Sequence, residues 1–154
     1  MPVIKAGTAR KKEAGPEDPL GAYSAELLSD SGGLTQFGAL VEELAPGSQS
    51  SLPHWHREED EMVLILSGEV ILREDGEETP LEPGDAVCWP KDTPVAHCLL
   101  NRSDAPARYV IVGTRAPLDR VTYPEHDRVQ HVDRLHDERR FTTLAGGPAE
   151  KPEP

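Results

Sequence analysis

Three histidines and one glutamate stand in an order that could hold a metal ion. His54 and His56 are one residue apart, Glu61 opens the next apolar run, and His97 lies in a later one. On an extended strand, residues two apart share a face at about 7 Å, so His54 and His56 can converge on one ion. Imidazole suits Zn, Fe, Ni and Cu, and a nearby carboxylate adds Mn. These four side chains are therefore candidate ligands.

The neighbours of these residues suggest an apolar pocket. Strand alternation places Val63 and Ile65 on the face of Glu61, where they would form the floor of the site. Each of these residues, taken singly, also has an ordinary structural explanation. A lone histidine on an apolar face is usually a core residue. The acidic run 58–60 reads as a solvated turn.

Other candidate sites are weaker. His126, His131 and His136 recur every five residues, a spacing that shares no face on a strand or a helix, so we expect them on the surface. Cys98 points away from its neighbour His97, which argues against a Cys–His nucleophile. The sequence has no serine nucleophile elbow, phosphate-binding loop or dinucleotide fingerprint.

The elements that would position the four side chains are short strands. Glycine and proline total 28 of 154 residues and separate short apolar segments, a pattern typical of a sandwich or barrel. The expected strands are Leu34–Leu44, Glu61–Leu66, Glu69–Arg73, Ala86–Trp89, Val95–Leu100 and Ala107–Val112.

The rest of the chain appears as flanking segments. We expect an irregular N-terminal arm over residues 1–30, with a short helix only around Ala22–Leu28, and a β-barrel domain over 31–116. Residues 117–144 should pack on the barrel, beginning as a loop and ending in a strand pair, Val129–Asp133 and Arg139–Leu144. Residues 145–154, rich in proline and glycine, should form a disordered tail.

Charge and hydropathy exclude several classes of function. The chain has 28 acidic and 16 basic residues, a net charge of −12, which disfavours nucleic-acid and membrane-surface partners. The longest apolar run, Met62–Leu66, cannot span a bilayer, and the first residues lack a signal-peptide pattern, so we expect a cytoplasmic protein. Cys88 and Cys98 should be free buried thiols there.

Two motifs resemble those of the cupin superfamily. The first runs from Gly47 over six residues to His54-x-His56, then four residues to Glu61 and six to Gly68. The second has Gly84 and Pro90, then His97 and, after three residues, Asn101. The chain departs from the pattern twice: the motif has five residues before its first histidine, and Asp92 replaces its glycine in a longer loop.

The resemblance implies an all-β jelly-roll barrel, a double-stranded β-helix. It also implies one divalent transition metal (Zn, Fe, Mn or Ni) bound by His54, His56, Glu61 and His97. An open coordination position would admit a small-molecule substrate. The protein would then be a metalloenzyme acting on a small oxygen-rich metabolite by isomerase, epimerase, lyase or dioxygenase chemistry.

A non-catalytic binder or sensor is the alternative function. A second titratable group that faces the metal, besides the ligands, would favour the enzyme over the binder. The candidates for such a group are Tyr109, Arg108, Arg73 and Asp60. The sequence does not show which of Arg108 and Tyr109 faces the pocket. We also expect a homodimer, because Met62, Leu64 and Leu66 are apolar on the face opposite the core; a second subunit or the N-terminal arm must cover them.

Overall fold

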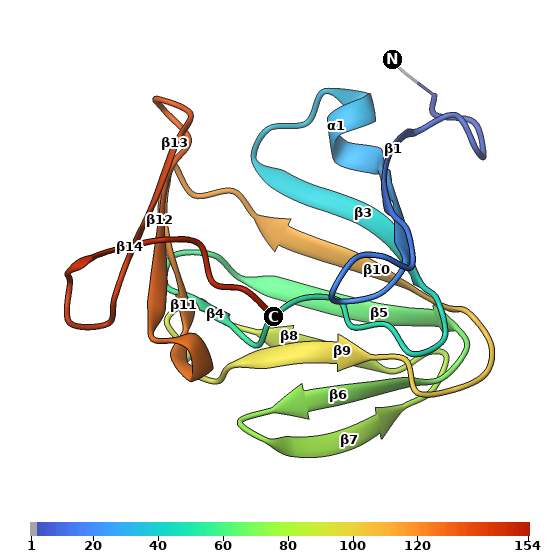
Figure 1. Cartoon of the computed structure of the whole chain (residues 1–154). Coiled ribbons are helices and arrows are strands. Elements are labelled where there is room, and N and C mark those ends of the chain that lie inside the picture. The colour runs from blue at the N-terminus through green and yellow to red at the C-terminus, as the bar shows by residue number, and fades with distance from the viewer. Residues whose placement is uncertain (1–2) are drawn as a thin grey trace.

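The computed structural model describes residues 3–154 and contains three antiparallel sheets (Figure 1). The predicted all-β class is confirmed, and the expected strands of residues 34–113 are all present within a few residues. The helices in the described range are α1 (Leu28–Gly32) and a single 3-10 turn, η1 (Pro124–His126). None of them is long and apolar enough to cross a membrane.

The largest sheet has six strands and forms one wall of the barrel. Its order is β1 (Arg10–Ala14), β2 (Tyr23–Leu27), β3 (Phe37–Leu44), β10 (Ala107–Thr114), β5 (Glu61–Ser67) and β8 (Ala86–Trp89). Strand alternation turns Val63, Ile65 and Tyr109 inward, where each is at most 2% exposed. The inward position of Val63 and Ile65 is the one that their spacing from Glu61 predicts.

A three-stranded sheet forms the opposite wall. Its order is β7 (Glu77–Leu81), β6 (Val70–Glu74) and β9 (His97–Leu100). The core between the two sheets joins Leu44, Ile65 and Tyr109 of the large sheet to Leu72 and Leu99 of the small one. His97 therefore begins a strand that is buried throughout.

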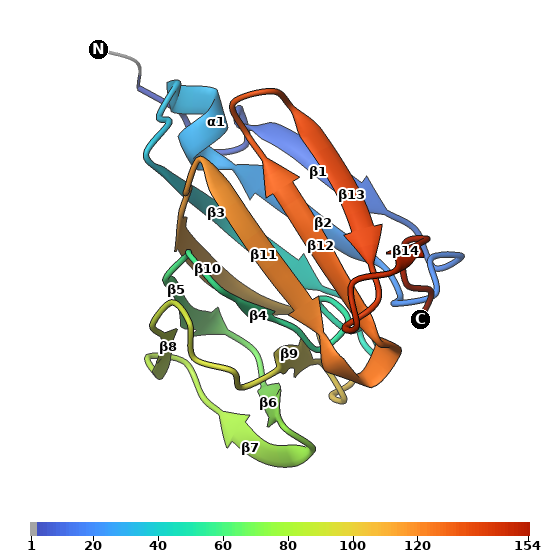
Figure 2. The ribbon, with the colours of Figure 1, turned by 90° about the vertical axis from the view of Figure 1, so that its left-hand side faces the viewer.

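The third sheet closes one end of the barrel. Its order is β14 (Pro148–Ala149), β13 (Glu138–Thr142), β12 (Arg128–Asp133), β11 (Leu118–Tyr123) and β4 (Trp55–His56). In Figures 1 and 2, β11–β13 stand across the ends of the other strands. The predicted pair β12–β13 is present. The predicted loop before it is wrong, since β11 occupies residues 118–123.

Both ends of the chain are more regular than the sequence predicts. Residues 1–30 are not an irregular arm within the described range, because β1 and β2 form a hairpin that extends the large sheet. Residues 23–27 are a strand, and the helix begins only at Leu28. The C-terminal tail is also ordered in part: β14 pairs with β13, and Pro152 is buried. Propensity misses these segments because pairing with a preformed sheet supplies the missing stabilisation.

One motif glycine is required by a close approach of two strands. Gly68 has a φ of +81°, and a β-carbon there would lie 2.7 Å from the backbone of Ala107. Any other side chain would clash with β10 and strain the turn after β5. This turn ends β5, the strand that begins at Glu61 and pairs with β10.

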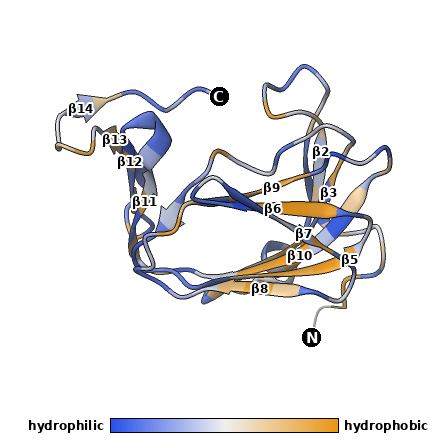
Figure 3. Ribbon diagram, turned by 90° about the horizontal axis from the view of Figure 1, so that it is seen from below, coloured by the Kyte–Doolittle hydropathy of each residue, from blue (hydrophilic) through white to orange (hydrophobic). Residues whose placement is uncertain are grey.

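The outer face of the six-stranded sheet is apolar. Figure 3 shows hydrophobic colouring along β5, β8 and β10. Two cross-strand rows make up this face: Val41, Val110, Leu64 and Ala86, and beside them Ala39, Val112, Met62 and Cys88. Met62 is 37% exposed and Leu66 43%. The N-terminal hairpin does not cover these rows, because β1 and β2 pair at the edge of the sheet.

We therefore retain the predicted homodimer, with a second copy of the chain on this face. Leu64→Glu places a charge in the middle of the two rows and should give a folded monomer, since the charge would have to be desolvated in an interface. Light scattering should give twice 16.8 kDa for the wild type and 16.8 kDa for the variant. Leu135→Glu, at a residue 70% exposed elsewhere, is the matched control. A monomeric wild type at micromolar concentration would contradict the prediction.

Candidate metal centre

The four residues expected from the sequence gather at the end of the barrel that β11–β13 cover. His54 and His97 face each other across an isolated bridge: the His54 N–H donates to the His97 carbonyl at 3.2 Å, and the His97 N–H donates to the His54 carbonyl at 3.0 Å. The ring centroid of His54 lies 5.3 Å from that of His97 and 5.1 Å from that of His56. Glu61 lies between the rings, 3.6 Å from His56 Nε2 and 3.9 Å from His97 Nε2.

The ligand atoms are close enough to share one ion. A ligand atom from each of His54, His56 and Glu61 lies within 4.8 Å of the other two. This grouping does not include His97, whose Nε2 approaches the cluster on the other side of Glu61. The structure thus brings together all four predicted residues, three of them as a tight group and one at its edge.

Each imidazole has its Nδ1 tied to a hydrogen-bond acceptor. His54 Nδ1 donates to the Leu52 carbonyl at 2.8 Å, His97 Nδ1 to the Val95 carbonyl at 3.1 Å, and His56 Nδ1 to Asp119 Oδ2 at 2.7 Å. A carbonyl only accepts, so the proton must lie on Nδ1. In the neutral form of each ring the lone pair is then on Nε2, which is the tautomer that a metal ion needs.

An unpaired nitrogen makes the fit to a metal specific. His97 Nε2 is the one buried side-chain nitrogen or oxygen without a hydrogen-bond partner in the part of the chain that the structure describes. Its distance of 3.9 Å from Glu61 is too long for a hydrogen bond. A buried unpaired acceptor is costly unless something else satisfies it. The donor set of three imidazoles and one carboxylate fits a divalent transition metal.

The electrostatics of the site act differently on its three charged or chargeable ligands His54, Glu61 and His56. Burial lowers the pKa of His54 to about 4, so this ring is neutral at ordinary pH. Burial alone would raise the pKa of Glu61, but the adjoining His97 and His54 outweigh it, and the pKa lies below the ordinary value. Burial likewise opposes the charged form of His56, but Asp119 and Glu61 raise its pKa above the usual range.

Asp119 is a positioning residue that the sequence analysis missed. Its Oδ2 accepts from His56 Nδ1, and its Oδ1 accepts from the Glu58 N–H at 2.9 Å. Asp119 is 4% exposed and belongs to β11, which was expected to be a loop. The sequence did carry a signal: Asp119 and Val121 alternate with exposed neighbours, so a carboxylate stands on the buried face of a strand.

Two further residues support the rings from behind. Trp89 stacks on His97 with ring centroids 3.7 Å apart and donates from Nε1 to Glu74 at 2.6 Å. Glu59 is only 7% exposed, binds Arg134 at 3.0 Å and accepts from the Ala116 N–H at 2.9 Å. The expectation that the whole acidic run is solvated is therefore wrong for Glu59, which fixes the segment after His56 onto the C-terminal sheet.

The departure from the second motif has a local explanation. Asp92, which stands at the motif's glycine, has a φ of +60°. Aspartate is one of the few residues that adopt this left-handed conformation at low cost. Its N–H donates to the His56 carbonyl at 3.0 Å. The longer loop thus keeps the backbone conformation that a glycine would supply, and it holds His56 as well.

A cavity of about 810 Å³ lies next to residues that contact His54. Its walls include Ser51, Leu52 and Tyr123, each of which also contacts His54. The Tyr123 ring lies 5.5 Å from the His54 ring, so this segment, whose role the sequence left open, lies between the imidazoles and the cavity. Its other walls come from β1–β3 and from the C-terminal sheet and tail, two regions that the sequence analysis treated as peripheral.

A larger groove of about 1260 Å³ runs along β11–β13. Its lining is mainly charged and reaches Glu58 and Lys91 rather than His54 or Tyr123. We therefore associate the chemistry of the site with the smaller cavity, whose walls include three residues that contact His54.

Glu42, beside Tyr109, is a buried titratable group that the sequence analysis missed. Tyr109 faces inward and is fully buried, whereas Arg108 faces outward and lies 3.6 Å from Glu43. Tyr109 donates its hydroxyl hydrogen to Glu42 at 2.5 Å, and Glu42 lines the cavity. The other two candidates, both on the surface, are engaged elsewhere: Arg73 binds Glu125, and Asp60 accepts from the Lys91 N–H. Glu42 was missed because nothing local distinguishes it from its exposed neighbour Glu43.

The remaining predicted residues are outside the site. His136 is exposed and bonds Asp133 at 2.8 Å, while His131 and His126 are half-buried away from the four ligands. Both cysteines are free thiols, as expected, but only Cys98 is buried; the expectation that Cys88 is buried is wrong, because Cys88 lies on the outer face of β8.

Comparison with known proteins identifies the fold. The protein-family model of the cupin domain matches residues 40–113 of this chain. A crystal structure described as a sugar phosphate isomerase of the cupin superfamily, from Silicibacter pomeroyi, is 34% identical and has a TM-score of 0.86, with 97% of each chain covered. No curated protein sequence matches significantly.

Two more distant structures share the fold. A proposed sugar phosphate isomerase from Acidithiobacillus ferrooxidans is 23% identical, has a TM-score of 0.82 and is covered over 96% of its length, against 97% of this chain. A protein from Thermotoga maritima, named as an oxalate decarboxylase, is 20% identical, with a TM-score of 0.61 over 74% of this chain and 99% of its own. The N- and C-terminal strands that wall the cavity lie within the more extensive matches.

Asp119→Asn should weaken metal binding by about 10- to 100-fold, because the amide no longer offers the charged acceptor that orients His56 Nδ1. The fold should persist, which circular dichroism checks. Competition with a chelator of known affinity measures the effect. Asp133→Asn, which breaks a similar Asp–His contact on the surface, is the matched control and should bind like the wild type. Equal affinities of Asp119→Asn and the wild type would show that this contact does not orient His56.

Proposed function

This chain belongs to the cupin superfamily, and we propose that it is a metal-dependent isomerase acting on a small oxygen-rich metabolite, with a sugar phosphate as the favoured substrate class. The divalent ion would be held by His54, His56, Glu61 and His97. We retain the cytoplasm as the predicted location.

The observation that carries this proposal is the set of three imidazoles with Nδ1 fixed and Nε2 free, one of which, His97 Nε2, is buried and unpaired. With Nδ1 fixed, each ring can present Nε2 to a metal without rotating, and His56, whose pKa Asp119 and Glu61 raise, would release its proton as the metal binds. A bound divalent ion supplies a Lewis acid that polarises a carbonyl oxygen of the substrate. The adjoining cavity of about 810 Å³ has room for a metabolite of that size.

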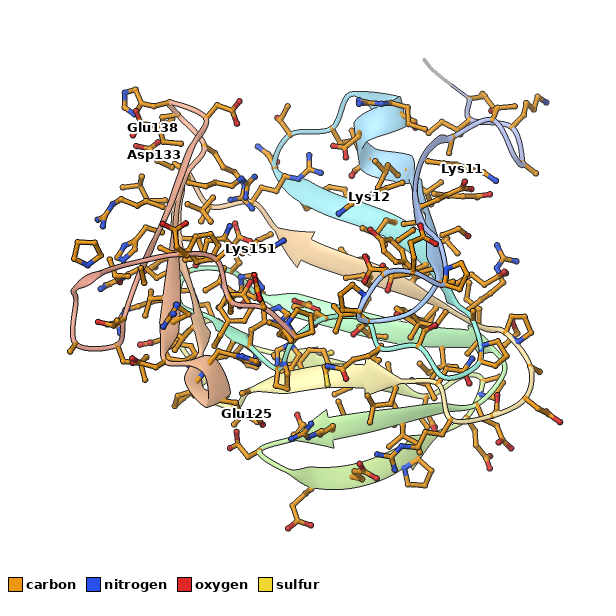
Figure 4. The ribbon with its side chains drawn as sticks, viewed as in Figure 1. Lys11, Lys12, Glu125, Asp133, Glu138 and Lys151 are labelled. Carbon is orange, nitrogen blue, oxygen red and sulfur yellow. The ribbon has the colours of Figure 1, made fainter. Side chains whose placement is uncertain are left out.

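The residues of the cavity support an anionic, hydroxyl-rich substrate. Lys12 of β1 and Lys151 of the C-terminal tail both line it, and neither forms an ion pair within residues 3–154. Figure 4 shows these two side chains extending into the space between the large sheet and the C-terminal segment. Gln49, Ser50 and Gln130 add uncharged hydrogen-bonding groups. Lysine ammonium groups bind phosphate as point charges, and amides and hydroxyls suit sugar hydroxyls.

The similarity to the structure from Silicibacter pomeroyi favours isomerase chemistry over the decarboxylase or dioxygenase alternatives. That match covers 97% of this chain, so it includes β1, β2 and the C-terminal sheet that form the cavity. The residues that line the cavity would contact the substrate, so they would determine which substrate binds.

Metal content tests the ligand set. The wild type, loaded at about pH 8 so that the imidazoles are unprotonated, should retain about one ion per chain after dialysis. His56→Ala and His97→Ala should each retain far less, because one of four ligands is lost. His136→Ala, at an exposed histidine, is the control. Elemental analysis gives the ratio. Full occupancy in both ligand variants would show that the metal lies elsewhere.

Turnover then separates enzyme from binder. The metal-loaded wild type is incubated with aldose and ketose phosphates of three to six carbons, their unphosphorylated forms and small dicarboxylates, and products are identified by NMR. Interconversion of an aldose and a ketose phosphate supports the proposal. Thermal stabilisation by a compound without any turnover would favour the binder or sensor.

Lys12→Gln should raise the KM for a phosphorylated substrate by about tenfold, the value of one lost charged hydrogen bond, with little change in kcat. Lys11→Gln is a matched control, because strand alternation turns Lys11 to the other face of β1. If both variants behave alike, Lys12 does not contact the phosphate.

A further inference from the structure

One buried carboxyl group of the cavity has no part in holding the metal. Glu42 stands in a cross-strand row on the inner face of the large sheet, paired with Ala25 on one side and Tyr109 on the other. The row continues to Lys12, the partner of Ala25, and to Ile65, the partner of Tyr109. The fold therefore aims Glu42 into the barrel, between the cationic wall of the cavity and the apolar core.

The two oxygens of Glu42 have different surroundings. Oε1 accepts the Tyr109 hydroxyl hydrogen at 2.5 Å, and Tyr109 itself is fully buried. Oε2 has no hydrogen-bond partner among the described residues. In those residues, the only side-chain nitrogen or oxygen that is both inaccessible to solvent and without a partner is His97 Nε2. Glu42 Oε2 must therefore have some solvent accessibility. Since Glu42 lines the cavity, we infer that Oε2 is accessible from the cavity. One oxygen fixes the group, and the other is free for a ligand.

Packing alone does not account for a glutamate here. Its inward neighbours on β3 are Leu40 and Leu44, and an apolar residue would fill the same space without the cost of burying a carboxyl group. Glu42 is only 9% exposed. Burial raises its pKa above the ordinary value, and the charge of Glu61 raises it further, whereas Tyr109 and Lys12 act in the opposite direction. A carboxyl group of this kind suits proton transfer near neutral pH.

The cavity extends from Glu42 to residues that contact His54. Its wall continues from Glu42 through Ser50 and Ser51 to Tyr123, which lies against the His54 ring. The Glu61 carboxylate is near enough to act on the pKa of Glu42. A substrate in this cavity would thus lie against Glu42 on one side and against the residues that contact His54 on another.

We propose that Glu42 is the proton-transferring residue of the site, carrying a proton between adjacent carbons of a hydroxy-carbonyl substrate, with Tyr109 as its positioning residue. This inference rests on the proposed isomerase function.

The reaction balances without a co-reactant. Glu42 Oε2 takes the proton from the carbon that bears the hydroxyl group, and the electrons of that C–H bond form a C=C bond while the carbonyl π pair moves to oxygen. The resulting enediolate moves its hydroxyl proton from one oxygen to the other. Glu42, whose carboxyl hydrogen exchanges with solvent through the cavity, then gives a proton to the former carbonyl carbon, and the new carbonyl forms next to it. The carboxylate is regenerated, and an aldose has become a ketose or the reverse.

The test uses the metal-loaded full chain, aldose and ketose phosphates of three to six carbons, and D₂O as solvent. The wild type should place solvent deuterium on the carbon next to the carbonyl, detected by NMR. Glu42→Gln, which keeps the shape but cannot carry the proton, should lose both turnover and deuterium exchange by about 100-fold or more. Its metal content should equal that of the wild type. Glu43→Gln, the outward-facing neighbour, is the matched control and should react normally.

A positioning role for Tyr109 has its own readout. Tyr109→Phe removes the hydrogen bond that lowers the Glu42 pKa, so the rising limb of the pH–rate profile should move to higher pH. The other charged groups facing Glu42 across the cavity are Lys12, Lys151, Asp18 and Glu153, and they are unchanged in this variant. A merely structural loss would lower the rate without moving the profile, and that result would overturn the role of Tyr109.

The outcomes separate the two proposals. Turnover by the wild type with undiminished turnover by Glu42→Gln overturns the inference and leaves the isomerase function standing. Turnover without solvent deuterium in the product also overturns it, because the hydrogen would then move directly between the carbons. If the loaded wild type converts none of the sugar phosphates, the proposed function is wrong, and the role of Glu42 falls with it. Loss of exchange and turnover in Glu42→Gln alone supports both.

Discussion

The site depends on the orientation of three imidazole rings. Each ring is held by a hydrogen bond from Nδ1, and the three acceptors come from separate parts of the chain: the loop before β4, the loop before β9, and Asp119 on β11. Because two of the acceptors are carbonyls and the third is a carboxylate, the tautomer of each ring is fixed, and Nε2 has the lone pair when the ring is neutral. The bridge between His54 and His97, Trp89 stacked on the His97 ring and the register of β5 all serve to keep these bonds aligned.

This constraint makes the C-terminal sheet a part of the site. β11 supplies the acceptor for His56 and, through Tyr123, the wall against His54; it also pairs with β4, the short strand that carries His56. Glu59, held by Arg134, ties the intervening segment to the same sheet. The barrel alone would place His54, His97 and Glu61, but it would leave His56 without its partner and the cavity open on one side.

The six-stranded sheet contributes residues both to the cavity and to the outer apolar face. The inner face of β3 presents Glu42, and its outer face presents Val41 in one of the apolar rows. Since alternate residues of a strand point to opposite faces, the same eight residues contribute to the pocket and to the predicted dimer contact. The N-terminal hairpin widens this sheet at its edge, so it adds Lys12 to the cavity without covering the apolar rows.

The sequence determined much of this protein because some features are local. Turn-forming residues between short apolar runs predicted the strands of residues 34–113, and the spacing of His54, His56, Glu61 and His97 predicted which side chains would converge. Alternation alone placed Val63 and Ile65 inward and left Met62 and Leu66 outside.

Only the tertiary structure decided the features that depend on pairing between distant segments. The strands β1, β2 and β11 have weak local patterns and are stabilised by the sheets they join, so the arm and the loop expected from sequence were wrong. Asp119 lies 63 residues from His56, and Tyr109 lies 67 from Glu42. No local pattern relates such partners. Their hydrogen bonds exist because the barrel closes and its C-terminal sheet covers the end where the histidines gather.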